Sequence, residues 1–389
     1  MIGGIKMALV KRLLNGGWKN KRSLFLRLIF YFMIRKIIPI MLAVLFITST
    51  VACADKVQLP KTGQTTKYAA GDDGDLRKGA AWRGPRFAVS NDCVTDNLTG
   101  LMWSKNGNMP NGTKTWQEAL DYVASLNSRG GVCGYTDWRL PNVNELESLV
   151  NAEKSDTATW LNTQGFTNAQ AGNYWSSSTY ASDMDGGALV VGMDDSSVGG
   201  IYKSYNYYVW PVRAGQSKSL GNSVIWQTGQ TTKYVAGDDG DIRKGTTWPS
   251  PRFTDKGNQM VKDNLTGLLW TKDANAPGPS ACGTGTKKKW PQALDYVACL
   301  NKNNYLGHND WRLPNRKELF SLVDRSKYKP ALPTGHPFIN VQQASNYWSS
   351  STNANHTVLA WYVNMVTGYM FSETKSFFLN YVWPVRAGQ

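Results

Sequence analysis

Two runs of aspartates are the first residues in this sequence whose type and spacing fit metal chemistry. The runs, both GDDGD, contain Asp72, Asp73, Asp75, Asp238, Asp239 and Asp241. Clustered carboxylates on a glycine-containing turn offer the hard oxygen ligands that Ca²⁺ prefers. Neither run continues into a complete EF-hand loop, and solvated Asp-Gly turns are common. We therefore favour a plain turn at both places, with calcium as the alternative and no other cofactor expected.

The serine run WSSST, at 175–179 and again at 348–352, is the second candidate for chemistry. A nucleophilic serine needs a nearby base and oxyanion donors. The three histidines, His308, His336 and His356, all lie in the second half of the chain. A Ser-His-Asp triad therefore cannot operate around both serine runs, and no S-x-x-K pattern includes these serines. We predict no catalytic residue.

Both motifs belong to a tandem duplication that covers most of the chain. TGQTTKYAAGDDGDLRKG at 62 returns as TGQTTKYVAGDDGDIRKG at 228, and DNLTGL, DWRLPN, NYWSSST and VWPVR recur in the same order. Shared order over this length indicates one duplicated unit rather than scattered short motifs. We place copy 1 at 62–216 and copy 2 at 228–389, each expected to fold alone, with a polar linker at 217–227.

The two copies differ in charge and in the stretch that precedes VWPVR. Copy 1 has 12 basic and 16 acidic residues, whereas copy 2 has 19 basic and 11 acidic residues. Side chains that vary on a retained framework are where binding specificity is expected. A solvated lysine-rich face is the alternative. We predict a site in copy 2 for an anionic polysaccharide, with a sugar stacked on Trp361, formed by Trp361, Tyr362, Lys287, Lys288, Lys289, Arg316 and Lys317.

Residues 1–54 form a basic N-terminal extension with nine Lys or Arg and no acidic residue. The stretch at 33–54 has a cationic start, a short apolar run and a small-residue end, which is typical of a secretory signal peptide. Cleavage at an A-x-A site would discard Cys53, whereas a loose lipobox would make Cys53 the lipidated first residue, and both remain open. Without this segment the net charge falls from +15 to +6, so we expect no nucleic-acid partner.

The remaining cysteines divide evenly between the copies. An even number of cysteines in an exported chain indicates disulfides. We predict the pairs Cys93–Cys133 and Cys282–Cys299. Zinc is disfavoured because the chain has no C-x-x-C motif and only three histidines.

The repeated phrases predict short elements that position these side chains. In DWRLPN, Trp138 and Leu140 alternate with polar residues, as on a strand with one buried face. Asn142 and Glu145 form a capping box that begins a helix. Arg139 follows an aspartate by two positions, and we interpret this as a structural ion pair rather than an anion receptor. Copy 2 repeats the arrangement with Arg312, Asn315 and Glu318.

Twelve of the sixteen tryptophans form six matched pairs between the copies. Bulky aromatic residues kept at strand and helix positions are expected in the core. A second capping box, Thr115 with Glu118, predicts an amphipathic helix from Trp116 onward. Two short helices and many short strands per copy predict an α+β fold.

The ordered set TDNLTGLMW, DWRLPN..EL, YWSSST and VWPVR resembles the bacterial family named for the C-terminal domain of the collagen-like adhesin Lcl. The resemblance covers both copies. It implies two tandem domains with a fold akin to the C-type-lectin and sulfatase-modifying-factor group, and recognition of sulfated glycans. The chain lacks the collagen-like Gly-X-Y stalk of that adhesin and has the domain twice, so neither trimerisation nor glycan specificity simply carries over.

We expect an exported, non-catalytic binding or adhesion protein of the periplasm, outer membrane or cell surface, or a secreted one. Two alternatives remain: an enzyme of the sulfatase-modifying type, which would need a reactive cysteine pair, and a structural surface-layer component. The oligomeric state stays open, and a membrane contact is expected only through a lipid on Cys53.

Overall fold

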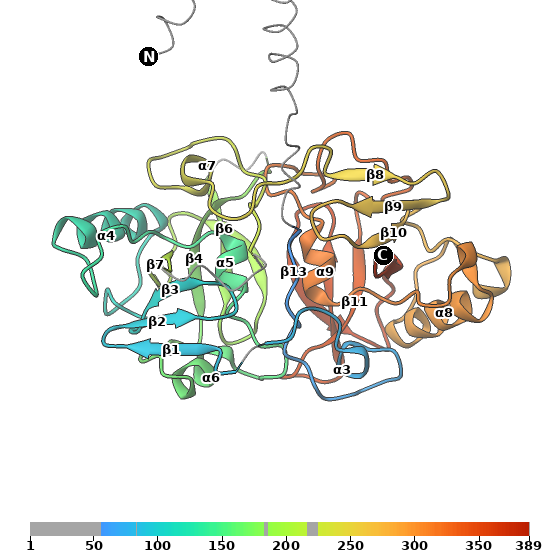
Figure 1. The fold of residues 1–389 in the computed structure, drawn as a ribbon, viewed down its shortest axis with the longest axis horizontal. Coiled ribbons are helices and arrows are strands. Elements are labelled where there is room, and N and C mark those ends of the chain that lie inside the picture. The colour runs from blue at the N-terminus through green and yellow to red at the C-terminus, as the bar shows by residue number, and fades with distance from the viewer. Residues whose placement is uncertain (1–55, 83, 183–185, 216–224, 389) are drawn as a thin grey trace, which may run out of the picture. The chain divides into compact units, whose positions relative to one another are not determined.

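One six-stranded antiparallel sheet runs through both copies of the repeat (Figure 1). The computed structural model describes residues 56–82, 84–182, 186–215 and 225–388. The sheet has the strand order β11-β12-β13-β6-β5-β4, and β13 of copy 2 pairs with β6 of copy 1 at Met370 and Val198. Its strands are β4 (Asn173–Thr179), β5 (Gly187–Gly192), β6 (Val198–Tyr202), β11 (Asn346–Thr352), β12 (Leu359–Asn364) and β13 (Met370–Thr374).

Each copy adds a four-stranded antiparallel sheet whose last strand comes from VWPVR. The orders are β1-β2-β3-β7 in copy 1 and β14-β10-β9-β8 in copy 2. The strands are β1 (Phe87–Ser90), β2 (Cys93–Asp96), β3 (Leu101–Ser104), β7 (Val212–Ala214), β8 (Phe253–Asp255), β9 (Met260–Asp263), β10 (Leu269–Thr271) and β14 (Val385–Arg386). Asp96 to Leu101 forms the turn between β2 and β3.

The predicted amphipathic helix is α4 (Trp116–Ser128), and its counterpart in copy 2 is α8 (Trp290–Lys302). The Thr115 side chain accepts the backbone N–H of Glu118, and Glu118 accepts the N–H of Thr115, which confirms the capping box. The remaining helices are α3 (Asp73–Leu76), α5 (Val143–Glu147), α6 (Thr157–Thr163), α7 (Asp239–Ile242), α9 (Arg316–Ser321) and the 3₁₀ turns η1 (Ser280–Cys282) and η2 (Tyr305–Gly307).

DWRLPN is the junction that enters α5 and α9. Asn142 and Asn315 cap these helices with full capping boxes, as predicted. Trp138 and Leu140 are buried as expected. The segment pairs with β7 only through the backbone of Arg139 and Val212, so it is an isolated bridge rather than a strand. The short helix ends at Glu147, before Leu149 and Val150 enter the core.

The matched tryptophans lie in the core, as predicted, with Trp82 and Trp248 only half-buried. The largest hydrophobic cluster takes residues from both copies, including Trp210 and Trp383. Residues from 56 onward belong to a single compact unit. The copies therefore share their core, and the expectation that each folds alone is not supported. Of the proposed linker at 217–227, Ile225 and Trp226 are buried, and the rest lies outside the described residues except Gln227.

Candidate functional site

The repeated TGQTTKY–GDDGD segments dock on the opposite copy. We call residues 57–80 and 225–246 the bridging segments. From the first, Gln64 exchanges hydrogen bonds with the backbone of Thr352 at 3.0 and 2.8 Å. From the second, Gln230 makes the same two bonds to Thr179. Helix α3 accordingly lies against β11 of copy 2, and α7 lies against β4 of copy 1 (Figure 1).

The capping asparagines of α5 and α9 hold the bridging segments as well. The side-chain amide of Asn142 donates to the carbonyl of Lys244 at 3.0 Å, and Asn315 donates to the carbonyl of Lys78 at 3.2 Å. Each amide oxygen meanwhile accepts the third N–H of its helix. One side chain therefore begins a helix in one copy and anchors the segment that comes from the other.

Each residue of GDDGD has a structural task. Asp72 caps α3 and also accepts the N–H groups of Tyr68 and Ala69. Asp75 accepts the N–H of Gly71 and pairs with Lys67 at 3.0 Å. A Cβ on Gly74 would lie 1.9 Å from the carbonyl oxygen of Thr66, so only glycine fits there. Asp238, Asp241 and Gly240 repeat these contacts.

Asp73 and Asp239 are buried, and each bonds to a serine of the opposite WSSST run. Ser351 donates to Asp73 at 2.5 Å, and Ser178 donates to Asp239 at 2.6 Å. Burial raises the pKa of both carboxyls to about 6, against the lowering effect of these hydroxyls. The serine hydroxyls are buried rather than solvated, and they accept the first N–H of α5 and α9.

The aspartates do not converge on a common point for an ion. Within the described ranges no three His, Cys, Asp or Glu side chains are placed to hold a metal. The capping, cross-copy and lysine contacts already engage the carboxylates of both runs. Both runs also form one-turn helices with two buried aspartates each, so they are not the plain solvated turns that we predicted.

Arg139 and Arg312 form buried ion pairs, as expected, but with different partners. Arg139 binds Glu145 through two bonds of 2.6 and 2.5 Å, and Arg312 binds Glu318 in the same way. Glu145 is the nearer partner because it is the third residue of the helix that follows. The aspartate of DWRLPN, Asp137, pairs instead with Arg213 of β7.

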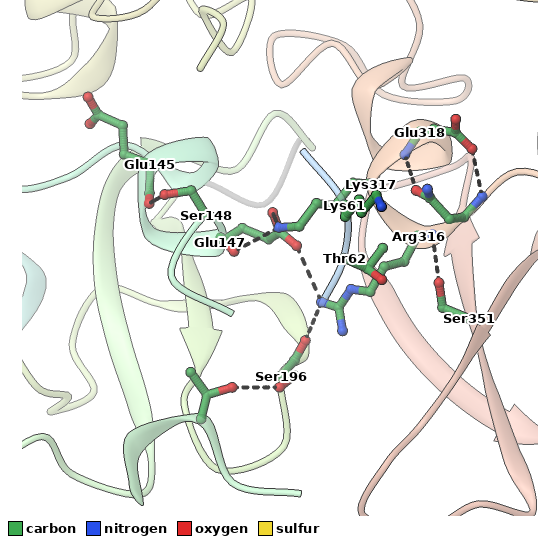
Figure 2. Close-up of polar contacts among 12 residues, drawn as sticks. Lys61, Thr62, Glu145, Glu147, Ser148, Ser196, Arg316, Lys317, Glu318 and Ser351 are labelled. Carbon is green, nitrogen blue, oxygen red and sulfur yellow. Dashed lines mark hydrogen bonds and ion pairs between the residues drawn. The ribbon is translucent and has the colours of Figure 1, made fainter. Parts of the chain in front are cut away.

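Three of the predicted ligand-binding residues are buried between the copies, which corrects their assignment to a surface. Arg316, Lys317 and Trp361 have exposed fractions of 1%, 3% and 3%. Figure 2 shows Arg316 and Lys317 directed from copy 2 toward Glu147 of copy 1. The Lys317 Nζ lies 2.8 Å from the Glu147 carboxylate, and the Arg316 guanidinium lies 3.6 Å from it.

The Trp361 ring packs against Arg316, one of the two cations that pair with Glu147. The Arg316 guanidinium stacks 4.1 Å from the centre of the Trp361 ring and donates to the Ser196 carbonyl at 2.7 Å. A sugar therefore cannot stack on Trp361 in this structure. The neighbouring Tyr362 is half-buried against Trp348, and burial together with Glu373 raises its pKa to about 12.

The lysine run has a different environment, on the outer side of copy 2. Lys288 pairs through its backbone with Asn380 at 2.8 and 3.0 Å, and its side chain turns inward to the carbonyl of Gly283. Because side chains alternate along an extended segment, Lys287 and Lys289 project from the opposite face. Both are exposed. The structure thus separates Lys288 from the two lysines that can meet a ligand.

Apolar side chains accompany these two lysines. In the antiparallel register around Asn380, Tyr381 lies opposite Lys287 and Leu379 lies opposite Lys289. The Lys287 Nζ is 5.1 Å from the centre of the Tyr381 ring. The loop continues with exposed Phe377 and Phe378. We call Lys287, Lys289, Phe377, Phe378, Leu379 and Tyr381 the basic-aromatic tip.

Copy 1 has the same backbone at this place with different side chains. Lys114 pairs with Tyr207 as Lys288 pairs with Asn380. The positions of Lys287 and Lys289 are taken by Thr113 and Thr115. Two of the additional lysines of copy 2 therefore lie together on one surface feature.

A surface pocket of about 500 Å³ opens beside the basic-aromatic tip. It is lined by polar groups of α8 and by the Cys282–Cys299 disulfide. The lining includes Lys287, Lys288, Gln292, Asp295 and Tyr296. Both predicted disulfides, Cys93–Cys133 and Cys282–Cys299, are present. Cys53 and the signal-peptide prediction lie outside the described residues.

Glu147 and the apolar part of the tip were not among the residues predicted from the sequence. Glu147 looked like an ordinary helix-surface acid, and its partners are 170 positions away. Aligning the two copies residue by residue shows the signal for Glu147, which takes the position of Phe320.

These features define a class of protein: a tandem α+β repeat with one disulfide in each copy. A family model described as the Lcl C-terminal domain matches residues 92–213 and 259–386, so the chain belongs to the Lcl C-terminal domain family in two tandem copies. Both bridging segments lie outside the matched ranges. No curated protein matches the chain. Among the described residues no helix has the length and apolarity needed to cross a membrane.

Proposed function

We propose that this protein is an exported, non-catalytic binding protein whose copy 2 recognises an anionic polysaccharide through the basic-aromatic tip. One observation carries the proposal: at matched backbone positions copy 1 has Thr113 and Thr115, whereas copy 2 has Lys287 and Lys289. The lectin-like fold relation and the cell-envelope or secreted location remain parts of this proposal. They rest on the family resemblance, the signal-like N-terminus and the disulfides.

The tip offers both kinds of contact that such a polymer needs. Sulfate or carboxylate groups would meet the two lysine ammonium groups, and a sugar ring would lie on the half-exposed Tyr381. The pocket bounded by Gln292 and Asp295 supplies hydrogen-bonding groups beside the charges.

A non-catalytic role agrees with how the reactive side chains are used. The WSSST serines that reach Asp73 and Asp239 are hydrogen-bonded within the core. All four cysteines of the described ranges are joined in disulfides, so they offer no free thiol pair of the kind that the sulfatase-modifying alternative requires. Rapid thiol labelling of the native protein would favour that enzyme instead.

The test is heparin binding by the full chain, with dextran as the neutral polymer. The variant Lys287→Thr/Lys289→Thr gives copy 2 the residues of copy 1. Loss of two exposed charge contacts, each worth up to about 1 kcal/mol, should weaken heparin binding by up to about thirtyfold at low salt. The difference should shrink as salt rises.

The matched control is Lys256→Thr/Lys302→Thr, which removes the same charge from exposed positions of copy 2 away from the tip. It should retain most of the binding. Equal loss in both variants would mean that only net charge matters, and no loss in the tip variant would refute the assignment.

A second candidate ligand is an anionic lipid surface. Phe377 is 74% exposed and packs on Phe378, with centroids 5.2 Å apart, beside the two lysines. Exposed aromatic residues flanked by lysines are typical of proteins that bind membrane interfaces. Phe377→Ser/Phe378→Ser should abolish binding to anionic vesicles if the lipid is the ligand, and should leave heparin binding nearly intact if the polysaccharide is.

A further inference from the structure

The interface between the copies contains a charge asymmetry that the bridging segments do not have. The segments differ at only two positions between residues 62–79 and 228–245, where Ala69 and Leu76 become Val235 and Ile242. Their cross-copy hydrogen bonds are also the same in kind. The segments alone therefore could not distinguish copy 1 from copy 2 as a docking partner.

Helices α5 and α9 do distinguish the copies. The matched positions after the capping asparagines are Val143 and Arg316, then Asn144 and Lys317. Three positions later copy 1 has Glu147, which meets Arg316 and Lys317 across the interface (Figure 2). All three charged side chains are at least 97% buried. Copy 2 has Phe320 where copy 1 has Glu147, and it lies in the shared core.

We propose that Glu147, Arg316 and Lys317 restrict the bridging-segment interface to pairs of one copy 1 with one copy 2. In a pair of two copies 1, each Glu147 would face the uncharged counterparts of Arg316 and Lys317. In a pair of two copies 2, four buried cations would have no carboxylate. Either arrangement leaves charges buried and unpaired, which is strongly unfavourable.

Polar atoms without hydrogen-bond partners at this interface strengthen the preference of copy 2 for a copy 1 partner. Arg316 Nε and one terminal nitrogen have no hydrogen-bond partner, and one Glu147 oxygen has none. Arg325, which is also buried, adds a further cation on the copy 2 side. Among the residues that the structure describes, Glu147 is thus the one carboxylate with which both Arg316 and Lys317 form ion pairs. The partner that fits this surface is a copy 1 half, from the same chain or from a second copy of this chain.

The experiment uses the full chain with a protease recognition sequence inserted between Gln216 and Ser223. Both disulfides lie within a copy, so cutting leaves the halves held only by non-covalent contacts. The cut protein is unfolded in guanidinium without reductant, refolded by dilution, and analysed by native mass spectrometry. The expected result is one copy 1 half with one copy 2 half, and no pairs of like halves.

Two variants separate selectivity from general damage. Arg316→Val/Lys317→Asn gives copy 2 the residues of copy 1, so mixed pairs should weaken by at least about a hundredfold while pairs of two copy 2 halves appear. Adding Glu147→Phe removes the remaining charge of these three residues, and mixed pairs should return beside like pairs. The milder Lys317→Asn serves if the double variant fails to refold, and it should shift the ratio in the same direction.

Comparable amounts of like and mixed pairs from the unmodified protein would overturn the proposal. So would a double variant that weakens every pairing equally, because this outcome would make the three residues general stabilisers. The variant Asp121→Asn, at an exposed position on α4, should leave the distribution unchanged.

Discussion

Ser351 donates its hydroxyl to the carboxylate of Asp73 at 2.5 Å, across 278 positions of the chain. The matched bond from Ser178 to Asp239 runs in the opposite direction between the copies. The WSSST motif, a candidate for catalysis, and the GDDGD motif, a candidate for metal binding, therefore bind each other. This contact occurs twice, once in each direction between the copies. Their repetition follows from a reciprocal interface.

The first prediction concerns the pH dependence of this contact. The folded pKa of Asp73 and Asp239, about 6, exceeds the ordinary value of 3.8 expected in the unfolded chain. Between these values the folded state binds more protons, so their stabilising contribution is complete below about pH 4 and is lost as pH rises through 6.

Asp73→Asn/Asp239→Asn should remove this component. Denaturant unfolding from pH 4 to 8 should show the variant gaining stability relative to the natural sequence as pH rises. The comparison is made as a difference because exposed carboxylates with lowered pKa values, such as Asp75, act in the opposite direction. A difference that stays constant across this range would contradict the prediction.

The second prediction is that replacing a capping asparagine lowers the stability of the protein more than replacing an ordinary helix-cap residue. Asn142→Ala removes the cap of α5 and leaves the Lys244 carbonyl without its donor. The two effects together should lower the free energy of unfolding by about 2–4 kcal/mol. Thr115→Ala removes a cap with no cross-copy bond and should cost about 1 kcal/mol. Equal losses in urea titrations would show that the second bond is without effect.

The third prediction separates core tryptophans from ligand contacts. Trp361→Ala should destabilise the protein by about 3–5 kcal/mol, because it leaves a cavity and removes the ring under Arg316. Trp138→Ala should cost a similar amount. Tyr202→Ala, at a 53% exposed ring, should change the melting temperature little. An unchanged melting temperature with lost heparin binding in Trp361→Ala would contradict the buried position.

The fourth prediction concerns the disulfides. Non-reducing peptide mapping should join Cys93 to Cys133 and Cys282 to Cys299, with no bond between the copies. Replacing either pair by serine should lower the free energy of unfolding by about 2–5 kcal/mol. A cross-copy bond in the mapped peptides would be incompatible with this fold.

Local rules made much of the fold predictable from sequence. Capping boxes at Thr115 and Asn142, the disulfide pairs and the tryptophan core depend on neighbours in sequence or on residue type, and the structure confirms them. The cross-copy docking was not predictable in this way. The two bridging segments are nearly identical, so their sequence fits either copy equally well.

The residues predicted for the candidate site also differ in whether the sequence alone could place them. Lys287 and Lys289 are exposed, as their charge indicated. Arg316 and Lys317 carry the same charge, yet they are buried and form ion pairs with a glutamate from the other copy. A charge in a sequence predicts solvation only when no distant partner of opposite sign exists, and a single sequence does not reveal that partner.

The bridging segments also constrain the order in which the two copies can fold while the chain is being synthesised. Residues 57–80 are synthesised long before the β11 strand that receives Gln64 and Asp73. Copy 1, in turn, lacks α7 until the following repeat has begun. Copy 1 therefore cannot close as it emerges, and the nascent chain must hold its first segment undocked until almost all of the second copy has been synthesised.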